Sequence, residues 1–422
     1  MKFLFVHQNF PGQFKSLAPT LASQSGVTVA SLSMRSQPQN SKIRSYNHTV
    51  ERGSTAGLHP TVTDFETKML RALSAVKAAE AMKAEGFTPD VIIAHPGWGE
   101  SLLLSEIWPQ SRQLHFLEFF YHSSGVDTDF DPEFALPTLE QRARVSSKRA
   151  APLWALAEMD WGLSPTQWQK ETYPVGEWSR ISVIHDGIDT RTIKPNPEAR
   201  ITLKEAGLVL KPGDPVITFV NRNLEPYRGY HIFMRALPEI LERHPTAQVL
   251  IVGGDSVSYG AAPPVGSPSW KQRFYDEVAD RIDRSRVHFL GNIPYQSFLG
   301  MLQVSAVHVY LTYPFVLSWS LLEAMATECL IVGSRTAPVM EVIEDGKDGV
   351  LVDFFDPSAL AAAVLDGLAR PDHFRAIRRA ARQKIVERYD LATVCLPAQI
   401  NLIDSVFQRP RAHHLSRSGG AI

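Results

Sequence analysis

The amino-acid sequence predicts an α/β protein made of two doubly wound domains, each built on a parallel sheet. Short apolar runs that fit buried strands alternate with segments of helical periodicity from residue 3 to residue 407. Residues 190–214 interrupt this alternation with three prolines and mixed charge, and a second alternation begins at Pro215. Strands that alternate with helices at short spacing indicate parallel strands joined by crossover helices. A length of 422 residues also favours two domains over one.

Composition and charge argue against several classes of protein. The chain is 44% hydrophobic with a formal net charge of −1, so its overall charge gives no indication of nucleic-acid binding. Cys329 and Cys395 stand beside apolar residues and are expected to be buried thiols of a reducing compartment. The apolar N-terminal run is too short for a secretory signal, and no run approaches the roughly 18 to 20 residues of a membrane span. We therefore expect a cytoplasmic location, with peripheral membrane contact left open.

The first predicted domain covers residues 1–190. Residues 33–62 are polar and are expected to form a long loop with some strand. The acidic stretch 127–133 lacks the glycine and terminal glutamate of a calcium loop, so we expect a solvated loop there. Strands are expected at residues 3–7, 27–32, 89–94, 114–120, 161–164 and 181–184, and helices at 13–24, 63–86 and 137–158.

The second predicted domain covers residues 191–390 and begins with a linker and a short helix. A C-terminal helix at 391–408 and a disordered basic tail at 409–422 are expected to follow it. Glu341 is expected in a loop. Strands are expected at residues 215–220, 248–252, 287–290, 307–311, 329–333 and 349–352, and helices at 229–243, 270–283, 295–303, 359–368 and from Trp319 onward.

Candidate ligand-binding residues of the second domain follow its strands, where parallel sheets bind ligands. Arg222 and Arg228 bracket a proline-containing turn after strand 215–220, and such a turn can aim two guanidinium groups at one diphosphate. Two solvated surface arginines are the alternative interpretation. Glu323 lies about one turn inside the helix that begins near Trp319, where it can reach a polar ligand.

Polar residues of the first domain also follow predicted strands. His95, Glu118 and His122 stand at or just beyond two strand ends, where one of them can transfer a proton or bind sugar hydroxyls. A hydrogen-bonded structural role is the alternative for each histidine. Gly12, in the first strand-to-helix turn, permits close approach of a phosphate, although a turn-forming glycine explains it as well. The basic face of helix 137–158 fits either an anionic acceptor or lipid head groups, or simply a solvated face.

Several segments, taken in order, resemble the retaining GT-B glycosyltransferases of family 4, also called glycosyltransferase group 1. The resemblance is densest from Val216 to Asp356. It implies two Rossmann-like domains that face each other across an interdomain cleft, with a C-terminal helix crossing back to the first domain. The matching segments are NFPGQ (9–13), IHDGID (184–189), VHFLGNI (287–293), LLEAMA (321–326), PVME (338–341) and GVLV (349–352).

The resemblance also implies roles for residues of this chain. Arg222 and Arg228 hold the donor diphosphate and act in catalysis, and Glu323 binds the ribose hydroxyls. His95 and Glu118 lie on the acceptor side, with Glu118 and His122 as catalytic candidates. The remaining donor-binding residues implied are Gly12, Ile293, Leu317, Ser318 and Leu322.

The sequence departs from the family pattern at three places. Arg228 stands where the family usually has lysine, which keeps the charge. Phe315 replaces the first of two glutamates spaced seven residues apart, and it cannot accept a hydrogen bond from a donor sugar. Glu118 takes the place of a histidine at the end of a first-domain strand. The pocket around the donor sugar is therefore expected to differ from that of the family.

The resemblance predicts transfer of a sugar from a nucleoside diphosphate sugar to an acceptor hydroxyl, in polysaccharide or glycolipid assembly. The acceptor is expected to be a carbohydrate, a glycolipid or a small molecule. No cofactor beyond the nucleotide sugar and no metal is expected, because two arginines and a helix end can stabilise the diphosphate; UDP or GDP is the expected nucleotide. Two alternatives remain, a nucleotide-sugar epimerase and a non-catalytic nucleotide-sugar-binding partner of an active enzyme. A dinucleotide oxidoreductase fits less well, because neither first strand is followed by GxGxxG.

Overall fold

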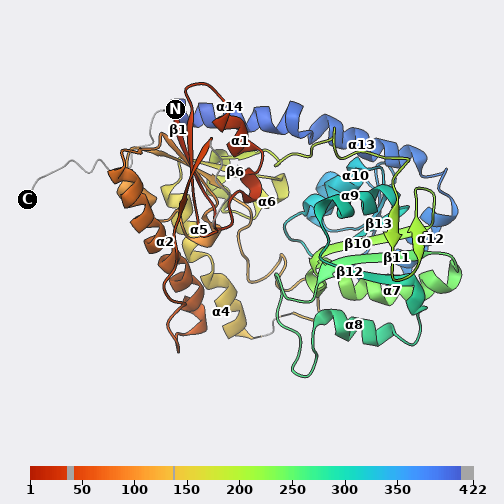
Figure 1. The fold of residues 1–422 in the computed structure, drawn as a ribbon. Coiled ribbons are helices and arrows are strands. Elements are labelled where there is room, and N and C mark those ends of the chain that lie inside the picture. The colour runs from red at the N-terminus through yellow and green to blue at the C-terminus, as the bar shows by residue number, and fades with distance from the viewer. Residues whose placement is uncertain (36–41, 136–137, 410–422) are drawn as a thin grey trace, which may run out of the picture. The chain divides into compact units, whose positions relative to one another are not determined.

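The computed structural model describes residues 1–35, 42–135 and 138–409 (Figure 1). The chain forms two compact units. Unit 1 consists of Met1–Asp186 together with the chain from Ala392 onward, and unit 2 consists of Gly187–Leu391. The sequence places the boundary at 190/191, and the structure divides the chain at 186/187. The expected disordered tail lies outside the described residues, except for Arg409.

Unit 1 contains a seven-stranded parallel sheet in the order β3-β2-β1-β4-β5-β6-β7. The order reverses between β1 and β4, which makes this pair of strands the switch point where doubly wound sheets bind ligands. The strands are β1 (Lys2–Val6), β2 (Thr28–Ser33), β3 (Ile43–Asn47), β4 (Val91–Ala94), β5 (Arg112–Phe116), β6 (Trp161–Ser164) and β7 (Ile181–Val183).

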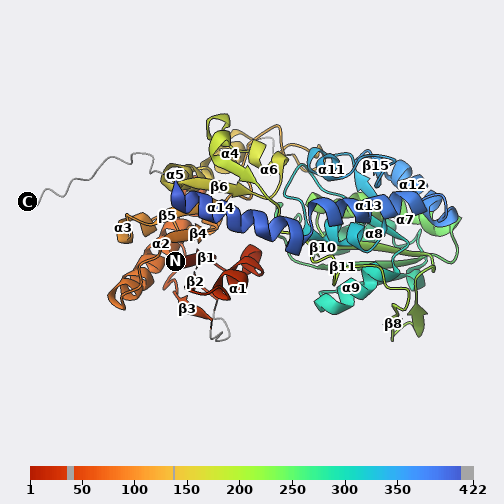
Figure 2. The same cartoon turned by 90° about the horizontal axis from the view of Figure 1, so that it is seen from above.

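Helices cover both faces of this sheet, because its strands are apolar on both sides. Phe3 and Phe5 of β1 pack into one core with α1 and α14, whereas Leu4 and Val6 pack into another with α2. Helix α14 lies against this unit beside α1 (Figure 2). The helices and 3-10 turns are η1 (Gly12–Phe14), α1 (Leu17–Ala22), α2 (Pro60–Ala84), η2 (Pro96–Trp98), α3 (Leu104–Ile107), α4 (Leu139–Ser147), α5 (Ala150–Glu158), α6 (Gln167–Glu171), η3 (Val175–Arg180) and α14 (Leu396–Gln408).

Unit 2 contains a six-stranded parallel sheet in the order β12-β11-β10-β13-β14-β15, which has the same switch-point arrangement. Helices α9, α10, α11 and α13 share one apolar core with it. The strands are β10 (Val216–Asn223), β11 (Gln248–Gly254), β12 (Val287–Gly291), β13 (Val307–Tyr310), β14 (Leu330–Ser334) and β15 (Val350–Val352). The helices and turns are η4 (Pro226–Arg228), α7 (Tyr230–Arg243), α8 (Trp270–Val278), η5 (Arg284–Arg286), α9 (Tyr295–Val304), α10 (Trp319–Ala326), α11 (Ala337–Val342), α12 (Pro357–Ala369) and α13 (Arg375–Arg388), followed by a π-helical turn (Leu391–Cys395).

Two predicted helices are wrong. The helix expected at 137–158 is two helices, α4 and α5, because the ring of Pro152 conflicts with the carbonyl of Lys148 one turn earlier. Pro152 is tolerated only in the first turn of α5. The short helix expected at the start of unit 2 is an antiparallel hairpin of β8 (Ile201–Leu203) and β9 (Leu208–Leu210). Gly207, at a φ of +61°, closes its turn.

One predicted loop is wrong, and another is only partly as expected. Glu341 lies in helix α11, which begins with a proline in its first turn. The acidic stretch 127–133 is a loop with Asp129 and Glu133 exposed, as expected, but Asp127 and Asp131 are buried. Asp131 instead accepts the backbone N–H of Glu133 at 2.9 Å and so closes a turn. No helix within the described ranges is long and apolar enough to span a membrane.

Candidate functional site

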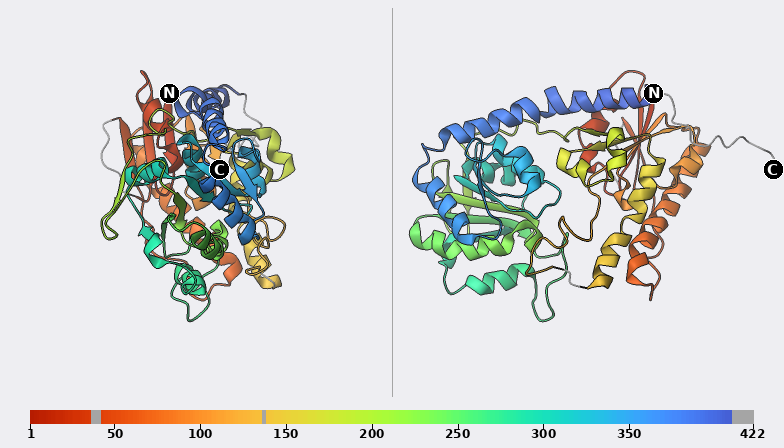
Figure 3. Two further views of the ribbon diagram at one scale, coloured as in Figure 1. Left: turned by 90° about the vertical axis from the view of Figure 1, so that its right-hand side faces the viewer. Right: turned by 180° about the vertical axis from the view of Figure 1, so that it is seen from behind.

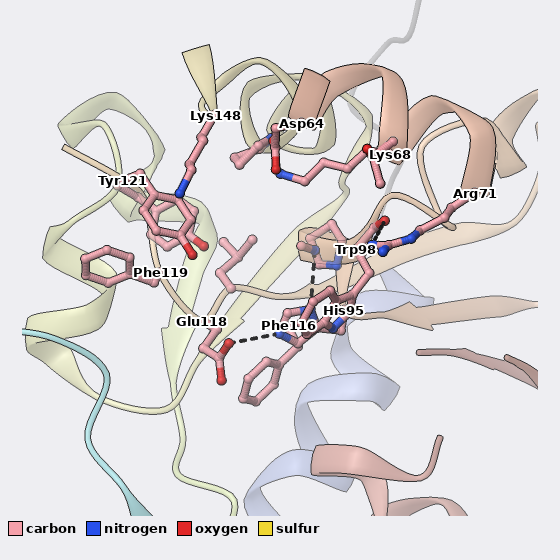
Figure 4. A pocket seen from close by; sticks show the side chains of 16 residues that line it. Asp64, Lys68, Arg71, His95, Trp98, Phe116, Glu118, Phe119, Tyr121 and Lys148 are labelled. Atoms are coloured by element: carbon pink, nitrogen blue, oxygen red, sulfur yellow. Dashed lines mark hydrogen bonds and ion pairs between the residues drawn. The ribbon is translucent and has the colours of Figure 1, made fainter. Parts of the chain in front are cut away.

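Three adjacent strands of unit 1 deliver polar side chains to the switch point of its sheet. His7 follows β1, His95 follows β4 and Glu118 lies two residues after β5. The strands pair in the order β1-β4-β5, so their carboxyl ends bring these three residues together. The His7 and His95 ring centroids are 5.3 Å apart, and His95 Nε2 is 3.4 Å from Glu118 Oε2 (Figure 4).

Hydrogen bonds fix how the two histidines are protonated. His95 Nδ1 accepts the backbone N–H of Gly97 at 3.3 Å, so the proton of a neutral His95 ring lies on Nε2, the atom that faces Glu118. His7 Nδ1 accepts the N–H of Asn9 at 2.9 Å. Burial, with His95 beside it, lowers the pKa of His7 to about 4, so this ring is neutral near pH 7.

Glu118 is the ionised carboxylate of this cluster. Burial opposes its ionisation, but the hydrogen bond and charge of His95, together with His7 and Gln13, hold the pKa of Glu118 below its usual value. Gln13 Nε2 donates to Glu118 Oε1 at 3.2 Å. A carboxylate that stays charged at a strand end can orient a hydroxyl group or accept its proton.

Gly12 is required beside this cluster for a steric reason. It has a φ of +47°, and a Cβ placed there would lie 2.6 Å from two atoms of the His7 ring.

His122 has a structural position instead, since its Nε2 donates to the carbonyl of Thr172 at 2.7 Å. The structure thus brings His95 and Glu118 together, whereas His122 does not line the cavity over these two residues.

A cavity of about 300 Å³ opens over His95 and Glu118. Helix α2 contributes to its wall, as does Lys148, which directly follows α4, the helix beside α2 (Figure 3). Its size is at the lower end of the range for small-molecule sites. Residues of the wall that the sequence did not single out as site residues are Lys68, Arg71, Trp98 and Tyr121. The sequence gives no distinct signal for Lys68 and Arg71, because α2 carries other charged residues such as Lys77 and Lys83 as well.

In unit 2 the switch point lies between β10 and β13, and the predicted arginines stand at its edge. Arg222 is exposed near the end of β10, and the described residues give it no hydrogen bond or ion pair. Arg228 is only 5% exposed. Its Nη1 donates to Thr312 Oγ1 at 2.8 Å and to the carbonyl of Val316 at 2.9 Å. Arg228 therefore holds the loop after β13, while Arg222 is free to meet a ligand.

Phe315 is buried and lies next to Arg228 in an aromatic cluster with Tyr227 and Tyr259. Its ring centroid is 4.9 Å from that of Tyr259 and 5.4 Å from that of Tyr227, and the Arg228 guanidinium lies 5.5 Å from it. Glu225, which the sequence analysis did not single out, positions the loop that carries Tyr259. Its buried carboxylate accepts the backbone N–H groups of residues 258–260.

The remaining predicted donor-binding residues differ in what they can offer a ligand. Glu323 is 5% exposed and accepts the hydroxyl of Tyr295 at 2.7 Å. Ser318 caps α10, with its Oγ accepting the N–H of Ser320 at 3.3 Å. Leu317 and Leu322 bury their side chains in the core of unit 2, which leaves mainly their backbone for a ligand, and Ile293 packs against this core with a partly exposed side chain. Gly12 belongs to unit 1.

No group of three or more His, Cys, Asp or Glu side chains within the described part of the chain is placed to hold a metal ion. The cysteines, Cys329 and Cys395, are buried free thiols.

Comparison with known proteins gives two family matches. Residues 25–193 match the family model described as glycosyl transferase family 4 group, and residues 202–384 match that described as glycosyl transferases group 1. The two matches fall within unit 1 and unit 2 respectively, apart from a few residues at the boundary.

Curated relatives match about half of the chain. D-inositol 3-phosphate glycosyltransferase of Corynebacterium urealyticum is 29% identical over 208 residues, which is 49% of this chain and 47% of the relative. GDP-mannose-dependent alpha-(1-6)-phosphatidylinositol monomannoside mannosyltransferase of Mycolicibacterium smegmatis is 29% identical over 229 residues, 51% of this chain and 52% of the relative. The chain thus spans about half the length of the curated relatives it matches.

Solved structures match over nearly the whole chain. The structure of HepE from Anabaena in complex with UDP and glucose has a TM-score of 0.67 and 16% identity, covering 96% of this chain and 100% of that one. Sucrose-phosphate synthase from Thermosynechococcus elongatus has a TM-score of 0.72 and 16% identity, covering 96% and 99%. At this identity the likeness shows a shared fold.

Proposed function

Since the chain belongs to the family 4, group 1 glycosyltransferases and has their GT-B fold, we propose that it transfers a sugar from a nucleoside diphosphate sugar to an acceptor hydroxyl, with retention of configuration. In this proposal unit 2 binds the donor and the cavity of unit 1 binds the acceptor. The family matches favour neither an epimerase nor a non-catalytic partner.

The observation that supports a donor site in unit 2 is the pair of arginines, Arg222 and Arg228, at the switch point of its sheet. The diphosphate gains charge as it leaves, and cationic donors fixed at that place stabilise the transition state more than the ground state. Arg222, exposed and without a protein partner among the described residues, supplies a full guanidinium. Arg228 keeps Nε and Nη2 for the ligand, since its recorded protein bonds use Nη1. The N-terminal end of α10 adds the positive end of its helix dipole to this field, so the proposal needs no metal ion.

The other donor contacts follow from the same loops. Glu323 binds the ribose hydroxyls, and the backbone near Ile293 and Leu317 meets the nucleotide. UDP or GDP is the proposed nucleotide, because HepE was solved with UDP and the Mycolicibacterium relative is named as dependent on GDP-mannose. Phe315 gives the donor sugar an aromatic neighbour in place of a carboxylate.

In unit 1, Glu118 orients the acceptor hydroxyl and accepts its proton, and His95 holds Glu118 in its ionised form. The proposed acceptors are carbohydrates, glycolipids or small polyols, with polysaccharide or glycolipid assembly as the setting. A cytoplasmic location belongs to the same proposal and fits two buried free thiols.

A thermal-shift screen tests the donor site. UDP, GDP, ADP and dTDP, with their sugar conjugates, are offered to the native protein, to Arg222→Ala and to Arg281→Ala. Arg281 is an exposed arginine of unit 2 that follows α8 and donates to the carbonyl of Glu277, so its variant is a matched control. We expect one nucleotide to raise the apparent stability by about 2.7 kcal/mol at one hundred times its Kd. The shift should vanish in Arg222→Ala and persist in Arg281→Ala; no shift with any nucleotide contradicts the proposal.

A further inference from the structure

A loop of unit 2 packs against the buried Arg228. It joins β11 to α8 and covers residues 255–269. The ring centroid of its Tyr259 lies 5.1 Å from the Arg228 guanidinium and 4.9 Å from the ring centroid of Phe315. Tyr259 is 37% exposed, whereas Phe315 is 4% exposed. Of these two rings beside Arg228, Tyr259 therefore presents far more surface to a ligand.

A buried carboxylate fixes the backbone that carries Tyr259. Glu225 is fully buried and accepts the N–H groups of residues 258–260 at 3.1 to 3.3 Å. Burial raises the pKa of Glu225, while these N–H groups and the charge of Arg228 favour the carboxylate. Asn223 Nδ2 also donates to Ser258 Oγ at 2.6 Å. Since hydrogen bonds to a charged acceptor are strong, this turn is held in place before a ligand binds.

Two further contacts hold the same part of the loop. A Cβ at Gly260 would lie 3.1 Å from the ring of Tyr227, so the glycine lets the loop pass close to that ring. The indole N–H of Trp270 donates to the carbonyl of Ala261 at 2.9 Å. Residues 264–266, by contrast, are exposed. The contacts of the loop therefore converge on the segment that carries Tyr259.

The place of Tyr259 indicates which part of the donor it meets. In the proposed function Arg228 binds the diphosphate, and Phe315 is the neighbour of the donor sugar. Little of the Phe315 ring is exposed, and the Tyr259 ring packs on it. A sugar joined to that diphosphate therefore meets the exposed part of Tyr259. Aromatic rings offer flat apolar surface, and the C–H groups on one face of a sugar ring can pack on it.

A contact to the sugar does something that the other proposed donor contacts cannot do. Arg222, Arg228 and Glu323 bind groups that the donor shares with the nucleoside diphosphate, which is the product. Their interactions do not favour the donor over the product. Discrimination between two ligands requires a group that only one of them carries, and here that group is the sugar.

We propose that Tyr259 determines donor specificity by stacking its ring on the apolar face of the transferred sugar, and that Glu225 is a positioning residue that holds Tyr259 in this place. The proposal rests on the proposed transferase function. It adds how the site distinguishes a nucleotide sugar from the free nucleotide that remains after transfer.

Calorimetric titration of the full chain tests the role of Tyr259. The ligand pairs are UDP with UDP-glucose and UDP-N-acetylglucosamine, GDP with GDP-mannose, ADP with ADP-glucose, and dTDP with dTDP-glucose. The quantity compared is the Kd of the free nucleotide divided by the Kd of its sugar conjugate. Tyr259→Ala should lower this ratio about tenfold for the nucleotide that binds, and Tyr259→Phe, which keeps the ring, should leave it within about threefold of the native value.

The ratio separates a sugar contact from an indirect effect. If Tyr259→Ala weakens the free nucleotide and its conjugate equally, Tyr259 acts only through Arg228 and the proposal is overturned. An unchanged affinity for both ligands overturns it as well. If the native protein binds none of the nucleotides, the transferase function fails first; nucleotide binding with an unchanged ratio removes only the role of Tyr259.

A double variant tests whether Glu225 acts through Tyr259. Glu225→Gln should lower the same ratio about threefold, because the turn is held less firmly. The double variant should bind the sugar conjugate no more weakly than Tyr259→Ala alone, since one interaction is lost in both cases. Losses that simply add would show that Glu225 stabilises unit 2 in general, which contradicts its positioning role.

Tyr275→Ala is the matched control. Tyr275 is a half-buried tyrosine of α8, and its ring lies 5.7 Å from the Arg284 guanidinium and 5.7 Å from the ring of Phe289. Its variant thus removes a similar contact between an aromatic ring and an arginine outside the loop, and should leave both Kd values unchanged. If Tyr275→Ala lowers the ratio as much as Tyr259→Ala, the loss reflects a weakened unit 2 and the proposal falls.

Discussion

Replacing Gly12 by alanine should destabilise unit 1 through two separate effects. A left-handed backbone, here at a φ of +47°, costs an alanine roughly 1 to 2 kcal/mol. The added Cβ would also lie 2.6 Å from the His7 ring, and overpacking of this kind costs about 1 to 3 kcal/mol more. Gly26→Ala isolates the first effect, because Gly26 has a φ of +74° and a Cβ placed there would have nothing within 4 Å.

Hydrogen exchange of the β1 amides measures how strongly each glycine variant destabilises unit 1. We expect these amides to exchange about 5 to 150 times faster in Gly12→Ala than in Gly26→Ala, since about 1.4 kcal/mol corresponds to a factor of ten. In a His7→Ala background the extra loss should disappear, because the ring that the new methyl group would strike is gone. Equal exchange in the two glycine variants would show that the close approach of Gly12 to His7 has no energetic effect.

Three further predictions concern protonation, catalysis and loop order. Unit 1 should lose stability as the pH falls from about 6.5 to about 4, since burial lowers the pKa of His115 to about 4 and the unfolded chain binds the proton more readily; hydrogen exchange of His115→Gln should show a shallower loss. Glu118→Gln should lower kcat for sugar transfer about a hundredfold or more and leave nucleotide binding in the thermal-shift assay unchanged. Glu225→Gln should speed exchange of the amides of residues 258–260 about tenfold or more, because a charged acceptor becomes neutral; Glu205→Gln, an exposed carboxylate of the same unit, is the control and should not change it.

The alternation of apolar runs with helical segments was enough to predict both parallel sheets, because a strand buried on both faces leaves a clear signal in the sequence. Breaks were harder. Pro152 ends the preceding helix through a clash with Lys148, a local effect that the apolar periodicity of residues 137–158 conceals. A hairpin of two three-residue strands is too short for its period to be distinguished from that of a helix.

For the candidate site, the sequence was enough to locate residues at strand ends, but not the side chains from other elements that surround them. His95 and Glu118 could be predicted to meet, since their strands are neighbours in a doubly wound sheet. The cations of the cavity could not be predicted to meet, because Lys68 lies on α2 and Lys148 follows α4, and the relative placement of these two helices depends on tertiary packing. Nor does spacing reveal that Arg228 is buried against Thr312 while Arg222 is exposed.

The position of α14 in the core of unit 1 bears on how this protein is made. Leu402, Ile403 and Val406 pack with Phe3 and Phe5 of β1, which precedes them by nearly 400 residues in the chain. All of unit 2, Gly187–Leu391, is translated between these two parts. The nascent chain therefore emerges with one face of its first sheet lacking part of its cover, while unit 2 can complete its own core from contiguous sequence. Until α14 leaves the ribosome, the apolar face formed by Phe3 and Phe5 is a surface of the growing chain that a chaperone can bind.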